Sequence, residues 1–197
     1  MTKKKPDIAR KVEKADGAAA RAVRPYRETL AVRALSYASK LGDQPPLRTL
    51  CAATIAAGLA GGNARLARAG ARMLAAHTLA TLAKDALKRR IDRTRPRSNG
   101  NARPAIEPGG HTSKEETSFP SGHSAGAAAV ASAFARDFPE YRWPAYAAAG
   151  AIALAQVPRC SHYPSDVGAG LGIGIAADAA IAAGARLLDT TKSDDGR

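Results

Sequence analysis

Three short clusters in this 197-residue sequence contain residue types that suit one kind of substrate, a phosphate ester. In the first, Lys88 precedes Arg95 in a basic stretch that ends at a proline. The second is the tetrapeptide Pro-Ser-Gly-His at 120–123, and the third places His162 shortly before Asp166. Cations bind phosphate oxygens, and a carboxylate near an imidazole fixes its tautomer and supports its positive charge. The residue types of the three clusters therefore indicate phosphoryl chemistry.

Each cluster alone also has an ordinary explanation. Lys88 and Arg95 suit the spread charge of a phosphoryl group, but a basic helix end is often a solvated face or a lipid-headgroup contact. The tetrapeptide has the form of a loop that enters a helix, with a capping serine and free N–H groups for an anion. A helix start with a chance histidine has the same form. Asp166 could orient His162, or it could cap a helix beside a surface histidine.

Taken together, the clusters have the order and spacing of one signature. Its parts are lysine, six residues and Arg-Pro; then Pro-Ser-Gly-His; then arginine, five residues, histidine, three residues and aspartate. Lys88, Arg95, the tetrapeptide at 120–123, His162 and Asp166 all match it. Over residues 36–188 the chain resembles the type 2 phosphatidic acid phosphatase family, whose superfamily includes the vanadium haloperoxidases.

The resemblance implies a metal-independent phosphatase that needs no cofactor. His162 would be the nucleophile that forms a phosphohistidine, with Asp166 orienting it. His123 would be the general acid that protonates the leaving alkoxide and later helps to activate water. The implied ligands of the phosphate oxygens are Lys88, Arg95, Ser121 and Gly122.

One position departs from the signature. Where the family has arginine, this chain has Gln156, and Arg159 lies three positions further on. A hydrogen bond to a charged group is worth ~1.5–3 kcal/mol, so losing the ionic part would slow catalysis about 10-fold or more. Three explanations stay open: Arg159 reaches into the site, Arg93 compensates, or activity is reduced. We expect compensation and count Gln156 and Arg159 among the phosphate-binding residues.

The elements that must position these residues are helices. Alanine supplies much of the 45% apolar content, aromatic residues make up only 5%, and long alternating β-branched runs are missing. The sequence predicts an all-α fold, a bundle of about five core helices after a short amphipathic helix at 29–41. The expected core helices are 47–62, 66–91, 122–137, 143–157 and 166–188, with a loop over 98–120.

We expect a single phosphatase domain at residues 28–190. A basic segment at 1–27, either a mobile tail or a loosely held helix, precedes it, and a C-terminal tail follows at 191–197. Cys51 and Cys160 lie far apart and predict no disulfide framework. The sequence shows no signal peptide, which disfavours a secreted acid phosphatase.

The sequence supports two environments for the helices. Charged residues interrupt the apolar runs, which are mostly shorter than the roughly 20 residues that span a bilayer. Terminal Lys and Arg can snorkel, however, and Ala/Gly-rich faces suit packing between membrane helices. We expect a membrane-embedded bundle in the bacterial inner membrane, with a soluble or peripheral bundle as the alternative. The side of the membrane that the site faces stays open.

The net charge of +13 favours an anionic partner. The leading prediction is hydrolysis of a phosphorylated lipid, either a phosphatidate-like ester or a polyprenyl (di)phosphate. Alternatives are a soluble acid phosphatase, a catalytically weakened phospholipid-binding protein, and a vanadium haloperoxidase, which is usually much larger. Nucleic acid is not an expected partner, because no nucleic-acid module is recognisable and aromatic stacking residues are scarce.

Overall fold

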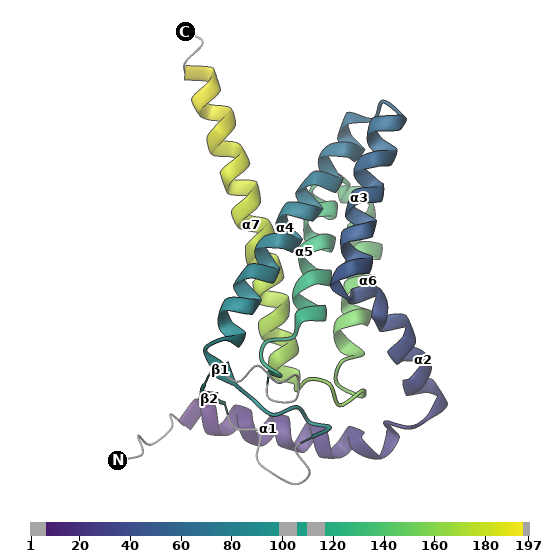
Figure 1. Cartoon of the computed structure of the whole chain (residues 1–197), viewed down its shortest axis with the longest axis vertical. Helices are drawn as coiled ribbons and strands as arrows, with labels where there is room; N and C mark the ends of the chain where they lie inside the picture. Colours follow the sequence, from purple (N-terminus) through teal and green to yellow (C-terminus); the bar gives the residue numbers. More distant parts are fainter. Residues whose placement is uncertain (1–6, 99–105, 110–116, 195–197) are drawn as a thin grey trace.

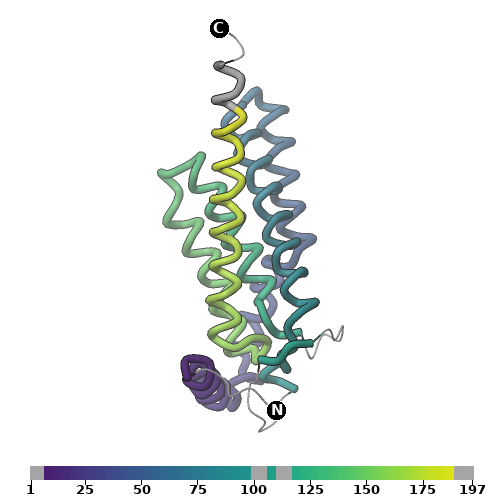
Figure 2. Tube along the Cα trace, turned by 90° about the vertical axis from the view of Figure 1, so that its left-hand side faces the viewer, coloured from purple at the N-terminus to yellow at the C-terminus, as the bar shows by residue number. Residues whose placement is uncertain are grey.

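A computed structural model describes residues 7–98, 106–109 and 117–194, with side chains to residue 188. Most of these residues are helical, which confirms the all-α prediction (Figure 1). The long helices run roughly along the longest axis of the molecule, and the C-terminal part of α7 (Pro164–Asp194) diverges from α3 (Gln44–Ala60) and α4 (Ala64–Lys88) (Figures 1 and 2). An N-terminal helix lies across one end of this bundle, at the foot of Figure 1.

Five helices form the bundle, as the sequence predicts. They are α3 (Gln44–Ala60), α4 (Ala64–Lys88), α5 (Gly122–Asp137), α6 (Arg142–Leu154) and α7 (Pro164–Asp194). The bounds of α5 agree with the prediction, and those of the others differ by a few residues. The helix α7 extends to Asp194, into the segment expected as a C-terminal tail.

Local sequence signals explain where several helices begin. The side chain of Asn63 accepts a hydrogen bond from the Leu66 N–H at 3.0 Å and caps α4. Ser121 caps α5 in the same way, accepting from the Ser124 N–H at 3.4 Å. The sharp turn between α3 and α4 places Gly62 at φ +63°, a conformation that glycine adopts without a steric penalty. These caps fix the starts of α4 and α5, the helices at which the first two sequence clusters lie.

The chain before α3 forms further helical segments. They are α1 (Asp7–Val23), the 3₁₀ turn η1 (Arg24–Tyr26), α2 (Leu30–Ala38) and the 3₁₀ turn η2 (Ser39–Gly42). The predicted amphipathic helix at 29–41 corresponds to α2 and η2. Residues 7–23, expected within a basic tail, form a helix that contacts α7.

A small antiparallel pairing joins the chain just after α4 to the segment expected to be a loop. The strand β1 (Ile91–Asp92) pairs with β2 (Glu107–Pro108). Part of the predicted loop over 98–120 lies outside the described residues. The pairing anchors the chain just after the end of α4, beside the basic cluster.

Small side chains dominate the centre of the bundle. The helix α5 packs against α4, α6 and α7, and all its residues from Ser124 to Ala133 are buried. Most of these residues are alanine, with larger side chains such as Met73 and Leu47 filling the surrounding core. Small residues allow helix backbones to approach closely. The packing of α5 against its neighbours therefore depends on its side chains being small.

Gly174 lies at one of these close approaches. A Cβ atom at this position would lie 2.3 Å from the Ala125 carbonyl oxygen and 2.7 Å from the Ala129 nitrogen. Gly174→Ala should therefore destabilise the fold by about 1–3 kcal/mol, because α5 and α7 must separate. Thermal unfolding measures the loss. Gly172→Ala is the matched control, since nothing lies within 4 Å of its Cβ position, and wild-type melting of both variants would contradict the prediction.

The outward faces of the bundle carry large apolar side chains. Leu59, Leu82, Leu154 and Ile175 are all more than half exposed. Among the described residues, one helix is long and apolar enough to cross a membrane, α7 over Pro164–Leu188, with a mean hydropathy of 1.6. Only 33% of that stretch is buried inside the protein, which is little for a core helix of a soluble protein. Exposed apolar faces of this kind are typical of membrane or interaction surfaces.

Candidate active site

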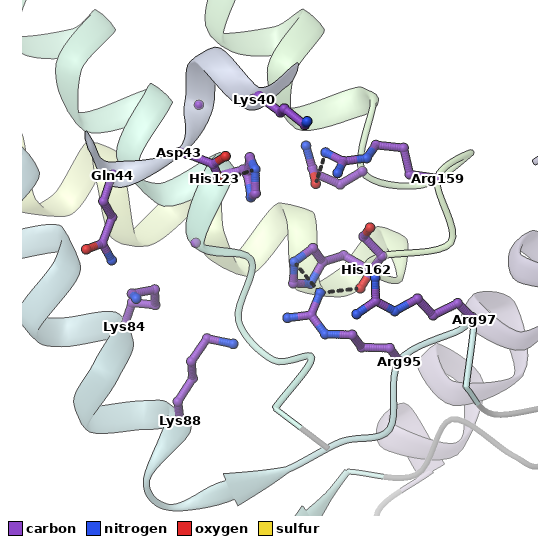
Figure 3. Close-up of a pocket in the computed structure, with 14 residues that line it drawn as sticks. Lys40, Asp43, Gln44, Lys84, Lys88, Arg95, Arg97, His123, Arg159 and His162 are labelled. Carbon is purple, nitrogen blue, oxygen red and sulfur yellow. Dashed lines mark hydrogen bonds and ion pairs between the residues drawn. The ribbon is translucent and has the colours of Figure 1, made fainter. Parts of the chain in front are cut away.

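A cavity of about 370 Å³ lies where α4 ends and where α5 and α7 begin (Figure 3). Both histidines of the sequence clusters line it, His123 from the first turn of α5 and His162 from the loop before α7. One acidic side chain, Asp43, is among its described lining residues. The basic lining residues are Lys40, Lys84, Lys88, Arg95, Arg97 and Arg159. The cavity is therefore strongly cationic and suited to an anionic ligand.

His162 is buried and held in one tautomer. Its Nδ1 lies 2.8 Å from the Ser118 carbonyl oxygen. Because a carbonyl only accepts hydrogen bonds, Nδ1 carries the proton and the lone pair is on Nε2. Arg95 Nη1, which is only a donor, lies 3.4 Å from Nε2. Nε2 thus carries an unprotonated lone pair and lies beside a guanidinium, the kind of group that binds phosphate oxygens.

Burial lowers the pKa of His162 from 6.5 to about 4, and the nearby charges of Arg95 and Lys88 add to the shift. The unfolded chain binds a proton on this residue below pH 6.5, whereas the folded protein does not until about pH 4. His162 should therefore remain an unprotonated nucleophile at pH 5, and the fold should lose stability between pH 6.5 and 4.

Imidazole ¹⁵N NMR of histidine-labelled protein tests this expectation. The chain has four histidines, and the His162→Ala spectrum identifies the signal. The signal should show the Nδ1–H tautomer and no protonation midpoint above pH 5. A midpoint near 6.5 would contradict the burial argument.

Asp166 is fully buried beside His162, but its carboxylate is not directly bonded to the ring. Its Oδ2 lies 3.7 Å from Nδ1 of His162. The same oxygen accepts hydrogen bonds from Ser118 Oγ at 2.6 Å and from the Tyr163 N–H at 2.9 Å. Since the Ser118 carbonyl holds Nδ1, Asp166 orients the histidine through Ser118 and supplies a negative charge near the ring.

His123 lies opposite an acidic residue that the sequence clusters do not contain. Its Nε2 is 2.9 Å from Oδ1 of Asp43, the residue directly before α3, whose side chain makes no capping hydrogen bond to that helix. A general acid must carry its proton, and a protonated His123 would form an ion pair with Asp43 at this distance. Gly42 makes room for this contact, because a Cβ there would lie 2.4 Å from the Ile152 side chain and 3.3 Å from His123.

The predicted phosphate ligands take different positions. Lys88 and Arg95 line the cavity, anchored by the Thr117 and Ser161 carbonyl oxygens respectively. Burial is the main cause that lowers the pKa of Lys88, at the cavity end of α4, to about 8, and the charges of Arg95 and Lys84 contribute to this shift. Gly122 also lines the cavity. Ser121 does not, because its side chain caps α5 instead.

The side chain of Arg159 lies beside Gln156. Gln156 is the residue that stands where the family signature has arginine. The Gln156 amide donates to the Ile152 carbonyl oxygen at 2.8 Å, and its Oε1 lies 3.4 Å from Arg159 Nη1. Arg159 also donates to Ser39 Oγ and lines the cavity (Figure 3). Arg93 is not among the cavity residues and is bonded to Asp166. Of the three explanations, the geometry favours the first, in which Arg159 reaches into the site, over compensation by Arg93.

Comparison with known protein families agrees with this arrangement. The model of the PAP2 superfamily matches residues 69–186, which contain every residue of the three sequence clusters. The chain belongs to the PAP2 superfamily. It is 39% identical over 107 residues to a lipid A 1-phosphatase of Rhizobium etli, a match that covers 53% of this chain and 45% of the relative.

A second lipid A 1-phosphatase, from Rhizobium johnstonii, is 48% identical over 65 residues, or 33% of this chain and 26% of the relative. The matched region thus spans less than half the length of these curated relatives. Two solved structures share the fold. The transmembrane PAP2-type phosphatidylglycerolphosphate phosphatase of Bacillus subtilis has a TM-score of 0.65 and 23% identity, covering 89% of this chain and 87% of its own. Aquifex aeolicus LpxE has a TM-score of 0.60 and 19% identity. The match covers 82% of this chain and 91% of the LpxE chain.

The PAP2 cavity also contains residues that the sequence clusters do not include. Lys84 lies one helical turn before Lys88, so helical spacing alone could have identified it. The other three come from distant parts of the chain. Lys40 lies in η2, Asp43 follows η2 directly, and Arg97 lies in the chain after β1. No spacing in the sequence connects these three to the histidines, because only the tertiary fold brings them together.

Proposed function

We propose that this PAP2 superfamily protein is a metal-independent lipid phosphatase that acts through a phosphohistidine. The observation that carries the proposal is the unprotonated Nε2 of His162 in a cationic cavity that it shares with His123. A phosphate ester in this cavity has a nucleophile, a proton donor and charged ligands for its oxygens. The two curated relatives, both lipid A 1-phosphatases by name, support a lipid phosphate as substrate.

The proposed reaction has two steps. In the first, the Nε2 lone pair of His162 forms a bond to phosphorus while the ester P–O bond breaks, and His123 gives its proton to the departing alkoxide. The ring then carries a positive charge, because Nδ1 keeps its proton. In the second step water attacks phosphorus, His123 accepts the water proton, and the N–P bond breaks to regenerate His162. Lys88, Arg95 and Arg159 stabilise the charge on the phosphoryl oxygens in both steps.

A membrane location accompanies this proposal. The apolar stretch of α7 and the exposed leucines of the outer faces suit a bilayer, with the cationic cavity at one end of the bundle. A lipid could then present its phosphate to the cavity while its chains remain in the membrane. Copurification with membranes, and extraction only by detergent, is the expected behaviour.

The decisive experiment measures phosphate release by detergent-purified protein in the presence of a chelator. The substrates are lipid A 1-phosphate, phosphatidylglycerolphosphate, a polyprenyl diphosphate and a soluble aryl phosphate. We expect chelator-resistant release that His162→Ala loses, with a lipid substrate preferred. Preference for the aryl phosphate would favour a soluble-type acid phosphatase. Binding of these esters by folded protein without any release would overturn the enzyme proposal in favour of a phospholipid-binding protein.

A further inference from the structure

A buried charge network connects the N-terminal helix to the active site. Asp16, near the middle of α1, is only 2% exposed. Its Oδ2 lies 2.6 Å from Nη2 of Arg93, whose side chain is completely buried. Nη1 of the same guanidinium pairs with Asp166. The chain Asp16–Arg93–Asp166 thus runs from α1 to the carboxylate beside His162.

Asp16 also holds the start of the helix that carries Asp166. Its Oδ1 accepts a hydrogen bond from the Ser165 N–H at 3.1 Å, and its Oδ2 accepts from the Ser165 hydroxyl. Ser165 lies in the first turn of α7, where backbone N–H groups have no partner within the helix. Arg93 donates to the Ser165 hydroxyl at 2.7 Å as well and lies over the Tyr163 ring. One carboxylate from α1 therefore fixes both the arginine and the start of α7.

The charges of these three side chains matter for the reaction proposed above. Phosphohistidine formation leaves a positive charge on His162, and the nearby Asp166 carboxylate can stabilise it. Arg93 alone would neutralise Asp166. With Asp16 present, the group of Asp16, Arg93 and Asp166 carries one net negative charge. Without Asp16 it would carry none, and in a buried environment a lost counter-charge has a large effect.

We infer that Asp16 and Arg93 are positioning residues of the active site, so that helix α1 completes the catalytic machinery. Asp16 offsets the charge of Arg93, which leaves Asp166 free to stabilise the phosphohistidine form of His162. This inference rests on the proposed phosphatase function. It assigns a role to a segment that lies outside the three sequence clusters.

Asp16→Asn tests the inference, because it removes the charge and keeps the shape. Expected is a 10- to 100-fold loss of kcat on the aryl phosphate, with KM within threefold of wild type. The double variant Asp16→Asn with Arg93→Met restores a net negative charge and should be at least fivefold faster than Asp16→Asn alone. If Asp16 and Arg93 had a purely structural role, the double variant would have a lower kcat than Asp16→Asn. Glu13→Gln, the same charge change one turn earlier in α1, should stay within twofold of wild type.

The outcomes separate the two proposals. A wild-type protein without His162-dependent hydrolysis would overturn both. An active wild type with Asp16→Asn at normal kcat, or with only KM raised, would overturn the inference alone. If Asp16→Asn fails to fold, the double variant decides the question: kcat within tenfold of wild type supports the charge argument, and a loss of 100-fold or more refutes it.

Discussion

Replacing His123 by glutamine should separate the two halves of the reaction. A lipid alkoxide is a poor leaving group and needs the proton of His123, so steady turnover of lipid phosphate should fall by about 10³-fold. An aryl phosphate has a good leaving group, so His162 should still be phosphorylated. Water activation would then fail, and one equivalent of phenol per protein should appear in a rapid burst before turnover stalls. Stopped-flow absorbance measures the burst.

Two variants complete this experiment. His162→Ala should show no burst, because no phosphohistidine can form. Asp43→Asn should slow lipid phosphate turnover more than the aryl burst, since it weakens the support for protonated His123 and leaves the nucleophile unchanged. If His123→Gln lost lipid and aryl activity equally, with no burst, its role as leaving-group acid would be wrong.

Arg159→Gln should reduce kcat/KM by about 10- to 100-fold, the equivalent of the ~1.5–3 kcal/mol of a charged hydrogen bond. Arg159 lies 3.4 Å from Gln156, and we propose that it supplies the cation that the family signature has in place of Gln156. The double variant Arg159→Gln with Gln156→Arg places the charge at the signature position. Its kcat/KM should return to within a few fold of the wild-type value. Steady-state kinetics on the preferred lipid measures both effects.

Arg33→Gln is the matched control for this pair, because Arg33 is an exposed basic residue of α2 and does not line the cavity. Its kinetics should equal those of the wild type. The single variant Gln156→Arg should change turnover little, since the cavity already has a cation at this place. A hundredfold gain from Gln156→Arg would mean that Arg159 does not compensate.

The helices and the principal site residues could be predicted from the sequence because their signals are local. Ser121 precedes an apolar run and caps α5, and the predicted start of that helix agrees with the structure. The resemblance to a family signature brought Lys88, Arg95, His123 and His162 into one prediction, and all four line the same cavity. A capping residue contacts backbone only a few positions away, so its role can be predicted without knowledge of the tertiary fold.

Contacts between distant parts of the chain could not be predicted. Asp16 and Arg93 are 77 positions apart, and nothing in the charged composition of residues 1–27 distinguishes one buried acid from its solvated neighbours. Likewise, nothing in the sequence connects Asp43 to His123, although the two side chains lie 2.9 Å apart in the fold. For both Asp16 and Asp43, the tertiary fold decides which of several possible partners the carboxylate contacts.

The alanine-filled α5 has a consequence for how this protein tolerates sequence change. An alanine scan, the usual way to find the residues that a fold depends on, would be almost silent along α5, because most of its buried positions are already alanine. The informative scan is the reverse one, in which valine or leucine is inserted at each position. Random mutagenesis should accordingly find intolerant sites where volume is gained, and evolution at this helix should be confined to exchanges among glycine, alanine and serine.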